Sequence, residues 1–195
     1  MSNVATRGSG LLEGFLSKQR AVLAKKQLKN LAEPNRLLDI GCGANPLFLR
    51  ICGFREKYGI DPSLLNEQLD DLILSRQAFI GQALPFATDF FDGVSALAVL
   101  EHLDLANNKL LLSQIFRVLR PGGKLVLTTP TPWTDKLLRF LAEINLVSKE
   151  EIMEHKSLLS LDLLKKLLIE AGFQPENIKG GYFELSMNQW LTAIK

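Results

Sequence analysis

Glycines and carboxylates gather in one short stretch of the chain, at a spacing that suits a ligand-binding turn. Gly41 and Gly43 flank Cys42, Asp39 precedes them, and Asp61 follows 18 residues after Gly43. Glycines let the backbone bend sharply and let a ligand approach where a Cβ would stand in the way. A helix that begins just beyond such a turn offers free N–H groups to a ligand. A carboxylate at the end of the next strand can accept hydrogen bonds from both hydroxyls of a ribose. The stretch therefore predicts a cofactor site.

The turn departs from the fingerprint of dinucleotide-binding proteins. That fingerprint has a third glycine in the first turn of the helix, where this chain has Pro46. It also does not require an acid two residues before the first glycine, where Asp39 stands. Asp61 has a second interpretation, as the cap of a helix that starts at Pro62. Cys42 has no histidine or lysine near it in the sequence to activate its thiol, so we expect it to fill space in the loop.

Two histidines are candidates for proton transfer. Glu101 and His102 follow, after Leu100, the apolar run Gly93–Val99, which predicts a central strand covered on both faces. Open parallel sheets place their active sites at the carboxyl ends of such strands. His102 is a candidate general base, because the ordinary pKa of histidine is near ~6.5; the alternative is a hydrogen bond in the pocket wall. His155 is a second candidate. No cluster of potential ligands has metal-binding spacing, so we expect no metal.

Alternating strands and helices are expected to position these residues. Helical spacing over residues 10–32 predicts a leading helix, which Pro34 ends. The predicted strands are Arg36–Ile40, Lys57–Ile60, Ala78–Gly81, Gly93–Val99 and Lys124–Pro130, followed by a hairpin of Gly181–Leu185 and Gln189–Lys195. The first predicted helix after the leading one begins at its cap, Asn45, and ends at about Cys52. The others run from Pro62 to about Leu72, from Leu105 to Leu119, over Asp135–Leu146, and over Leu161–Ala171, the last of which has Ser160 as its cap.

This order of elements predicts an α/β fold. We expect a Rossmann-like, mostly parallel seven-stranded sheet with a C-terminal antiparallel hairpin and helices on both faces. The 195 residues suit a single domain. Within it, residues 1–34 form an N-terminal helical arm and residues 131–158 a candidate lid segment.

Charge and composition limit the classes of function. Residues 1–30 carry a net charge of +5 and the rest of the chain −3. A nucleic-acid groove would spread basic groups over the domain, so nucleic acid is not the expected partner. The basic arm is either a solvated helix face or a flap that attracts an anionic substrate or surface. The two cysteines form no CxxC, no apolar run approaches the ~20 residues of a membrane span, and Met1–Gly10 lacks the apolar core of a signal peptide. A cytoplasmic location follows as the expectation.

Four segments, in this order, resemble the class I S-adenosylmethionine-dependent methyltransferases, and most closely the type 11 small-molecule methyltransferase superfamily. The resemblance covers about residues 36–195. The segments are LDIGCGANP at the first strand, YGIDPS at the second, ALPFATDFFDGVSALAVLEHL from Ala83, and FRVLRPGGKLVLTTP from Phe116.

The resemblance implies S-adenosyl-L-methionine as the cofactor and methyl transfer to an O, N or C atom of a small molecule. It assigns cofactor binding to Gly41, Cys42, Gly43 and Asp61, with Asp39 organising the loop and favouring the cationic end of the cofactor. Leu97 and Ala98 would border the methionine moiety, and Gln82 and Ala83 would lie at the adenine, with Leu84 and Phe86 as its walls. The family often has an acid or asparagine where this chain has Gln82. Glu101 and His102 would face the methyl group or support the pocket.

Two other functions stay open at this point. The first is methylation of protein or RNA, which only the basic N-terminal helix favours. The second is a non-catalytic module that binds S-adenosylmethionine. The segment Trp133–Leu146 has three interpretations: a core-facing helix, a hydrophobic lid over the acceptor, or a helix on a membrane surface.

Overall fold

The computed structural model describes residues 11–29, 31, 36–64, 67–69, 72–76, 82–134 and 159–195. Its helices are α1 (Leu11–Leu28), α2 (Leu47–Ile51), α3 (Leu105–Val118) and α6 (Leu161–Glu170), with 3₁₀ turns η1 (Leu100–His102) and η2 (Pro175–Asn177). Its strands are β1 (Arg36–Ile40), β2 (Glu56–Asp61), β3 (Glu67–Leu69), β4 (Leu72–Arg76), β5 (Phe91–Leu97), β6 (Leu119–Pro130), β7 (Ile178–Phe183) and β8 (Asn188–Ile194).

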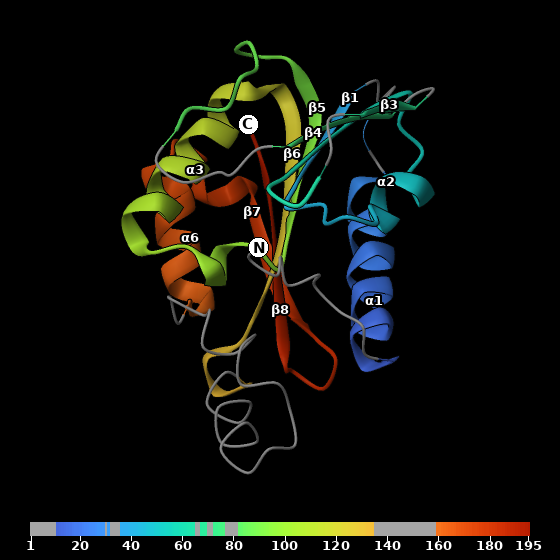
Figure 1. Cartoon of the computed structure of the whole chain (residues 1–195). Coiled ribbons are helices and arrows are strands. Elements are labelled where there is room, and N and C mark those ends of the chain that lie inside the picture. Colours follow the sequence, from blue (N-terminus) through green and yellow to red (C-terminus); the bar gives the residue numbers. More distant parts are fainter. Residues whose placement is uncertain are drawn as a thin grey trace.

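The described strands form one sheet in the order β3-β4-β2-β1-β5-β6-β8-β7 (Figure 1). Strands β4, β2, β1, β5 and β6 run parallel to one another. Strand β8 pairs antiparallel with β6, and β7 pairs antiparallel with β8. The predicted fold class and the C-terminal hairpin are therefore confirmed. The three-residue strand β3, antiparallel to β4, is an addition at one edge.

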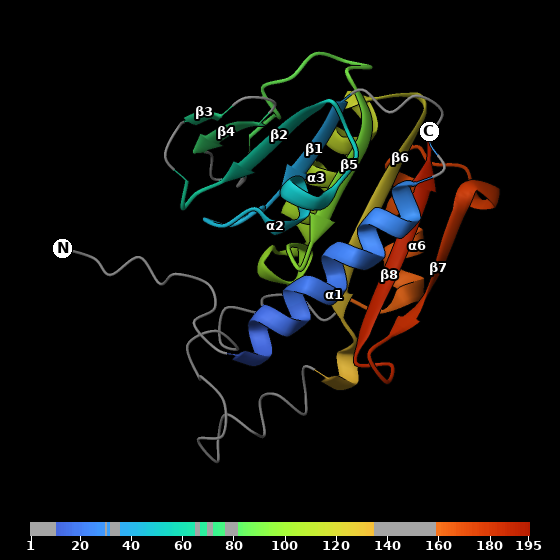
Figure 2. The same cartoon turned by 90° about the vertical axis from the view of Figure 1, so that its right-hand side faces the viewer.

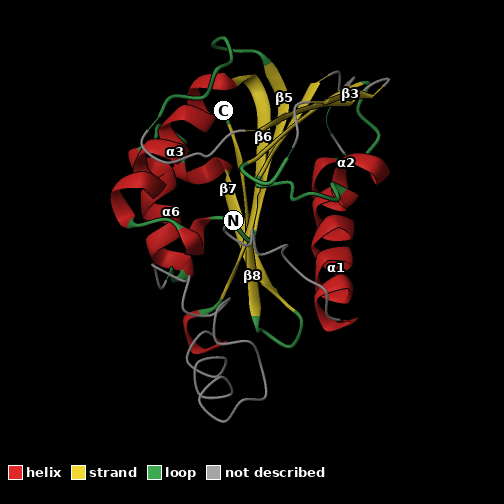
Figure 3. Ribbon diagram, viewed as in Figure 1, coloured by secondary structure: helices red, strands yellow, loops and turns green. Residues whose placement is uncertain are grey.

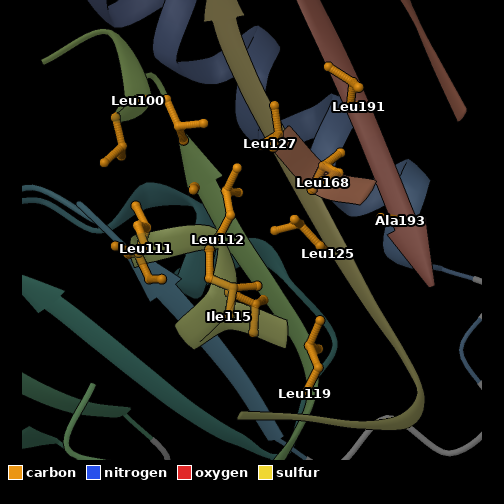
Figure 4. Packing of buried hydrophobic residues seen from close by; sticks show 14 of the residues in the cluster. Leu100, Leu111, Leu112, Ile115, Leu119, Leu125, Leu127, Leu168, Leu191 and Ala193 are labelled. Carbon is orange, nitrogen blue, oxygen red and sulfur yellow. The ribbon is translucent and has the colours of Figure 1, made fainter. Parts of the chain in front are cut away.

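Helices cover both faces of the sheet, as predicted. Helices α1 and α2 lie on one face and α3 and α6 on the other (Figure 3). Strands β1 and β5 are almost entirely buried, because parallel strands with helices on both sides have no solvent face. The larger core fills the α3 and α6 side, where Figure 4 shows aliphatic side chains from four elements packed together: Leu111, Leu112, Ile115, Leu125, Leu127, Leu168 and Leu191.

Helix α1 packs on the sheet through small residues. Ala21, Ala24 and Leu28 are buried in one cluster with residues of β1 and β6. By contrast, Phe15, one of its largest apolar residues, is 55% exposed. Alanines allow the helix backbone to come close to the strands. The Nζ of Lys124 in β6 donates a hydrogen bond of 2.6 Å to the carbonyl oxygen of Gln27, where the partial negative charge at the end of a helix favours a cation.

One predicted helix is wrong, and some predicted boundaries move. From Pro62 to about Leu72 the structure has a turn and strand β3 instead, and β4 follows at Leu72–Arg76. The Asp61 side chain accepts a hydrogen bond from the Ser63 amide, a local turn that competes with a helix. The apolar residues of β4 then pair with β2. The strand predicted at Ala78–Gly81 and the helix predicted over Asp135–Leu146 lie outside the described residues.

Other predicted details hold with small shifts. Ser160 caps α6 by accepting from the Leu163 amide, as predicted. The cap of α2 is Pro46 rather than Asn45. The loop of the C-terminal hairpin spans residues 184–187. Among the described helices, none combines the length and the apolar character that a membrane crossing needs.

Candidate active site

The strand order places the site at the carboxyl ends of β1 and β5. From β1 the chain moves outward to β2 and β4, and it then returns to pair β5 with the other side of β1. Ligands of open α/β sheets bind in the crevice outside such a reversal. In Figure 2, α1 crosses this face of the sheet diagonally, in front of the strands.

A buried carboxylate marks this reversal point. Asp39 of β1 is only 3% exposed and lies beside Ser95 of β5 in the register. The Ser95 hydroxyl donates a hydrogen bond of 2.6 Å to Asp39 Oδ1. Burial raises the pKa of Asp39 to about 7, the Ser95 hydrogen bond opposes this rise, and the charge of Asp61 adds to it. Asp39 is thus a carboxyl group that can gain or lose its proton near neutral pH.

The two glycines of the loop are suited to their positions for different physical reasons. Gly41 and Gly43 both have a left-handed φ, of 70° and 71°. A Cβ on Gly41 would stand 2.5 Å from Cγ2 of Val99, so packing excludes a side chain there. A Cβ on Gly43 would meet nothing within 4 Å. The loop therefore presents bare backbone to open space at Gly43, as a ligand that lies close to the chain requires.

Asp61 fastens this loop to the end of β2. Its Oδ2 accepts a hydrogen bond of 2.9 Å from the Gly43 amide, and its Oδ1 accepts from the amide and hydroxyl of Ser63. An ionised carboxylate has about four acceptor positions. Three are used by described residues, which leaves one position on Oδ2 within the described part of the chain. Cys42 fills space as expected: its Sγ lies where a Cβ on Gly59 would approach it to 2.8 Å.

A small cavity of about 60 Å³ joins the predicted residues to helix α1. Four of the predicted residues line it: Asp39, Gly41, Cys42 and Leu97. The other lining residues are Ser17, Arg20 and Ala21 of α1, with Asn45, Leu47 and Phe48 after the loop. We call this cavity the Asp39 pocket. Arg20 is the only cation among its lining residues.

Sequence reasoning missed the α1 residues and Ser95. Arg20 counted only as one charge of the basic arm, although Ala21, Ala24 and Leu28 repeat at the spacing of a helix face that packs closely. Ser95 also had a signal, because it is the only polar side chain in the run Gly93–Val99.

The remaining predicted residues near β5 lie beyond the Asp39 pocket. Ala98 has a φ of 56°, a left-handed conformation that non-glycine residues adopt at an energetic cost and that is common at functional sites. Its amide donates a hydrogen bond of 2.9 Å to the Thr128 carbonyl oxygen. Glu101 is buried and His102 is half-buried, both in the turn η1, which begins three residues after the end of β5. His155 lies outside the described residues.

The segment expected at the adenine leads into β5. Gln82 and Ala83 are exposed, in the connection that leads to β5. Leu84 is buried and Phe86 is half-buried, and their expected place as walls of the adenine stays a prediction. The Arg117 guanidinium binds the carbonyl oxygens of both residues. The Phe86 ring also packs against Phe91, at the first residue of β5 and thus at the opposite end of that strand from the glycine loop.

A larger hollow of about 310 Å³ lies elsewhere, between α3 and α6. Its lining includes Lys109 and Glu170, which form an ion pair of 2.9 Å, and none of the predicted site residues. We assign the site to the Asp39 pocket despite its smaller volume, because the reversal point, the bare loop and the buried acid are all there. In the part of the chain that the structure describes, no group of three histidine, cysteine, aspartate or glutamate residues could hold a metal ion.

Comparison with known proteins agrees with this geometry. A profile described as the methyltransferase domain matches residues 12–178. The chain therefore belongs to the methyltransferase domain family, and the resemblance drawn from the four sequence segments is confirmed.

Curated relatives and solved structures fit the same family. An O-methyltransferase from Penicillium expansum is 30% identical over 159 residues, which cover 73% of this chain and 53% of that protein. A ubiquinone biosynthesis O-methyltransferase from Dinoroseobacter shibae is 28% identical over 184 residues, which cover 86% of this chain and 73% of that protein. A SAM-dependent methyltransferase structure from Archaeoglobus fulgidus has a TM-score of 0.65 at 20% identity, covering 95% of this chain and all of that one, and it supports the fold. The chain spans about half the length of several fungal relatives.

Proposed function

We propose that this chain transfers a methyl group from S-adenosylmethionine to a small molecule, with an oxygen atom as the favoured acceptor. The observation that carries the proposal is the bare glycine loop between two buried acids, Asp39 and Asp61, at the reversal point of a methyltransferase-family sheet. The choice of oxygen is supported by the curated relatives, which are named as O-methyltransferases.

The residues present fit this cofactor. Its amino-acid end carries an ammonium and a carboxylate, and the Asp39 pocket offers a carboxyl group and a guanidinium, Arg20. The pocket is far smaller than the ~300–1,000 Å³ of a complete small-molecule site. We therefore assign only the amino-acid end to it, and we place the rest of the cofactor along the open loop at Gly43. The last acceptor position of Asp61 would serve a ribose hydroxyl. Gln82 and Ala83 keep their proposed place at the adenine, and Ala98 its place beside Leu97.

The chemistry asks little of the protein beyond alignment. When bound, the cofactor supplies a methyl group on a positively charged sulfur, which is already activated for transfer. The chain's part is to hold the acceptor atom in line and to keep water out. A neutral alcohol or phenol also needs a base. We assign that role to His102, in the turn after β5, with the buried Glu101 beside it. His155 stays a second candidate.

Other expectations stay predictions. They are the single domain with its N-terminal arm, the lid at residues 131–158, and a cytoplasmic location. A weak contact with a membrane surface and the lack of a nucleic-acid partner also stay predictions.

Binding and turnover need separate tests. Calorimetry should show binding of S-adenosylhomocysteine and none of NAD; a failure to bind S-adenosylhomocysteine would overturn the proposal. A panel of phenols, alcohols, amines and carboxylates is then incubated with the protein and S-adenosylmethionine, and S-adenosylhomocysteine release is measured. Binding without release from any acceptor would favour the non-catalytic module. For a phenolic acceptor, His102→Gln should lower the rate at neutral pH while cofactor affinity stays the same.

A further inference from the structure

The turn η1, which carries the proposed base His102, is only three residues long. A 3₁₀ turn this short has little rigidity of its own, because its hydrogen-bond geometry is poorer than that of an α-helix. The His102 amide donates to the Val99 carbonyl oxygen at 3.1 Å, and the Leu103 amide donates to the Leu100 carbonyl oxygen at 3.2 Å. The position of the imidazole therefore depends on what holds this turn from outside.

A buried asparagine of α3 binds both ends of the turn. The Nδ2 of Asn108 donates hydrogen bonds of 3.0 Å to the carbonyl oxygen of Leu100 and of 3.2 Å to that of Leu103. Leu100 is the first residue of η1 and Leu103 is its C-cap, so Glu101 and His102 lie between the two points of attachment. An asparagine Nδ2 has two N–H donors, one for each carbonyl oxygen. The amide group thus forms a bridge across the turn.

These two bonds explain why a polar side chain stands in the core at this place. Asn108 is fully buried, and its Oδ1 has no hydrogen-bond partner among the described residues. Burying an amide group costs free energy unless hydrogen bonds compensate for the lost water, and the unpaired oxygen adds to that cost. An apolar side chain of similar size, such as leucine, would avoid it. The Asn108 amide group therefore serves the turn rather than the core.

Helix α3 gives Asn108 a firm support. The Asp104 side chain caps this helix by accepting a hydrogen bond of 2.8 Å from the Asn107 amide. One turn further on, Leu111 is fully buried in the larger core. Leu100 of η1 belongs to the same cluster, which Figure 4 shows. The turn is therefore attached to a helix whose own position is fixed by its cap and its packing.

On its other side the turn is in contact with the glycine loop. A Cβ on Gly41 would stand 2.5 Å from Cγ2 of Val99, so the Val99 side chain lies directly against the loop backbone. The Val99 carbonyl oxygen is also the acceptor of the His102 amide. Packing at Val99 and the two hydrogen bonds of Asn108 together determine where His102 lies relative to the loop. A displacement of about 1 Å at a reacting group can lower a rate about a hundredfold.

We propose that Asn108 is a positioning residue, which holds the η1 turn so that the His102 imidazole meets the hydroxyl group of a neutral acceptor at the carboxyl end of β5. The inference rests on the proposed function, in which His102 takes the proton of that hydroxyl group. The asparagine should therefore matter for acceptors that need a base and not for acceptors that are already ionised. Loss of its amide group should lower kcat and leave the KM for S-adenosylmethionine unchanged.

The kinetic test compares Asn108→Leu, which fills the space but lacks the donors, with Asn107→Leu as the matched control. Asn107 is the neighbouring asparagine, and its amide group binds the Asp104 carboxylate instead. With a neutral phenol at pH 7, Asn108→Leu should lower kcat by about ten- to hundredfold, and the control should keep its full activity. At a pH above the pKa of the phenol itself, the loss should disappear. Added to His102→Gln, Asn108→Leu should cause no further loss, because its effect passes through His102.

A second measurement needs no methyl transfer. The chain has two histidines, His102 and His155, and a spectrum of His102→Gln identifies the ring signals of His102 by proton NMR. These signals should move in Asn108→Leu and stay in place in Asn107→Leu. If circular dichroism shows that Asn108→Leu does not fold, Asn108→Ala takes its place in both measurements.

Three kinetic outcomes would overturn the proposal: an unchanged kcat in Asn108→Leu, an equal loss with the ionised phenol, or a further loss on top of His102→Gln. Ring signals of His102 that do not move in Asn108→Leu would overturn it as well. A protein that releases no S-adenosylhomocysteine with any acceptor would instead overturn the proposed function, and the ring signals would then decide on their own whether Asn108 places His102.

Discussion

Binding of the cofactor should release a proton from Asp39. In the free protein, burial raises the pKa of this carboxyl to about 7. A bound ammonium group favours the ionised carboxylate and lowers that pKa. Protein at pH 7 would then release about half a proton for each ligand bound, nearly one at pH 6 and about one tenth at pH 8. Below pH 7, affinity should fall about tenfold for each pH unit.

Calorimetry can count this proton directly. S-adenosylhomocysteine is titrated at pH 6, 7 and 8 in two buffers with different heats of ionisation, and the difference between the observed heats gives the number of protons released. Asp39→Asn should abolish the buffer dependence, because the amide cannot titrate but can still accept from the Ser95 hydroxyl. Ser95→Ala should move the midpoint to higher pH, since the Ser95 hydrogen bond lowers the pKa of Asp39. Heats at pH 6 that do not depend on the buffer, or that depend on it equally in Asp39→Asn, would refute the reasoning.

Three further predictions concern stability and the loop. The pKa of Asp39 is raised from 3.8 to about 7, so its contribution to stability is present below about pH 4 and is lost as the pH rises through 7. Asp39→Asn should therefore raise the free energy of unfolding of the free protein at pH 8 by up to about 4 kcal/mol, measured by denaturant unfolding. At pH 4 the same substitution should change that free energy little. Gly41→Ala should lower the free energy of unfolding by about 1–3 kcal/mol more than Gly43→Ala, because both glycines are left-handed but only a Cβ at Gly41 meets Val99. Adding Val99→Ala to Gly41→Ala should restore part of that difference in denaturant unfolding. Asp61→Ala should weaken S-adenosylhomocysteine at least about tenfold in a protein that is still folded, since the Gly43 amide loses its acceptor; unchanged affinity by calorimetry would contradict this.

Local signals explain which parts of the fold could be predicted. Strand β1, the cap Ser160 and the C-terminal hairpin depend on short-range patterns, and each was found within a few residues. The glycine loop was also predictable, because a left-handed backbone and a close approach both restrict the residue type to glycine. Asp39 and Asp61 followed from their places at strand ends.

Long-range partners explain the errors. Nothing in the residues near Leu72 distinguishes a helix from a strand, and pairing with β2 decides the outcome. The close packing of α1 depends on a strand about 100 residues away, so the role of Arg20 could not be read from its own segment. The Arg117 guanidinium binds the carbonyl oxygens of Leu84 and Phe86, and the residues of that segment gave no signal of this long-range contact.

The packing of α1 also has a consequence for synthesis on the ribosome. Helix α1 lines the Asp39 pocket and is synthesised before the strands of the sheet. The Lys124 side chain that binds the carbonyl oxygen of Gln27, in the last turn of α1, comes 97 residues later. Contacts between residues so far apart form late, because a long loop must close first. A chain interrupted before β6 has the glycine loop and both acids but lacks the strand whose Lys124 binds the last turn of α1. The last contacts of α1 with the sheet are therefore made only after β6 has been synthesised.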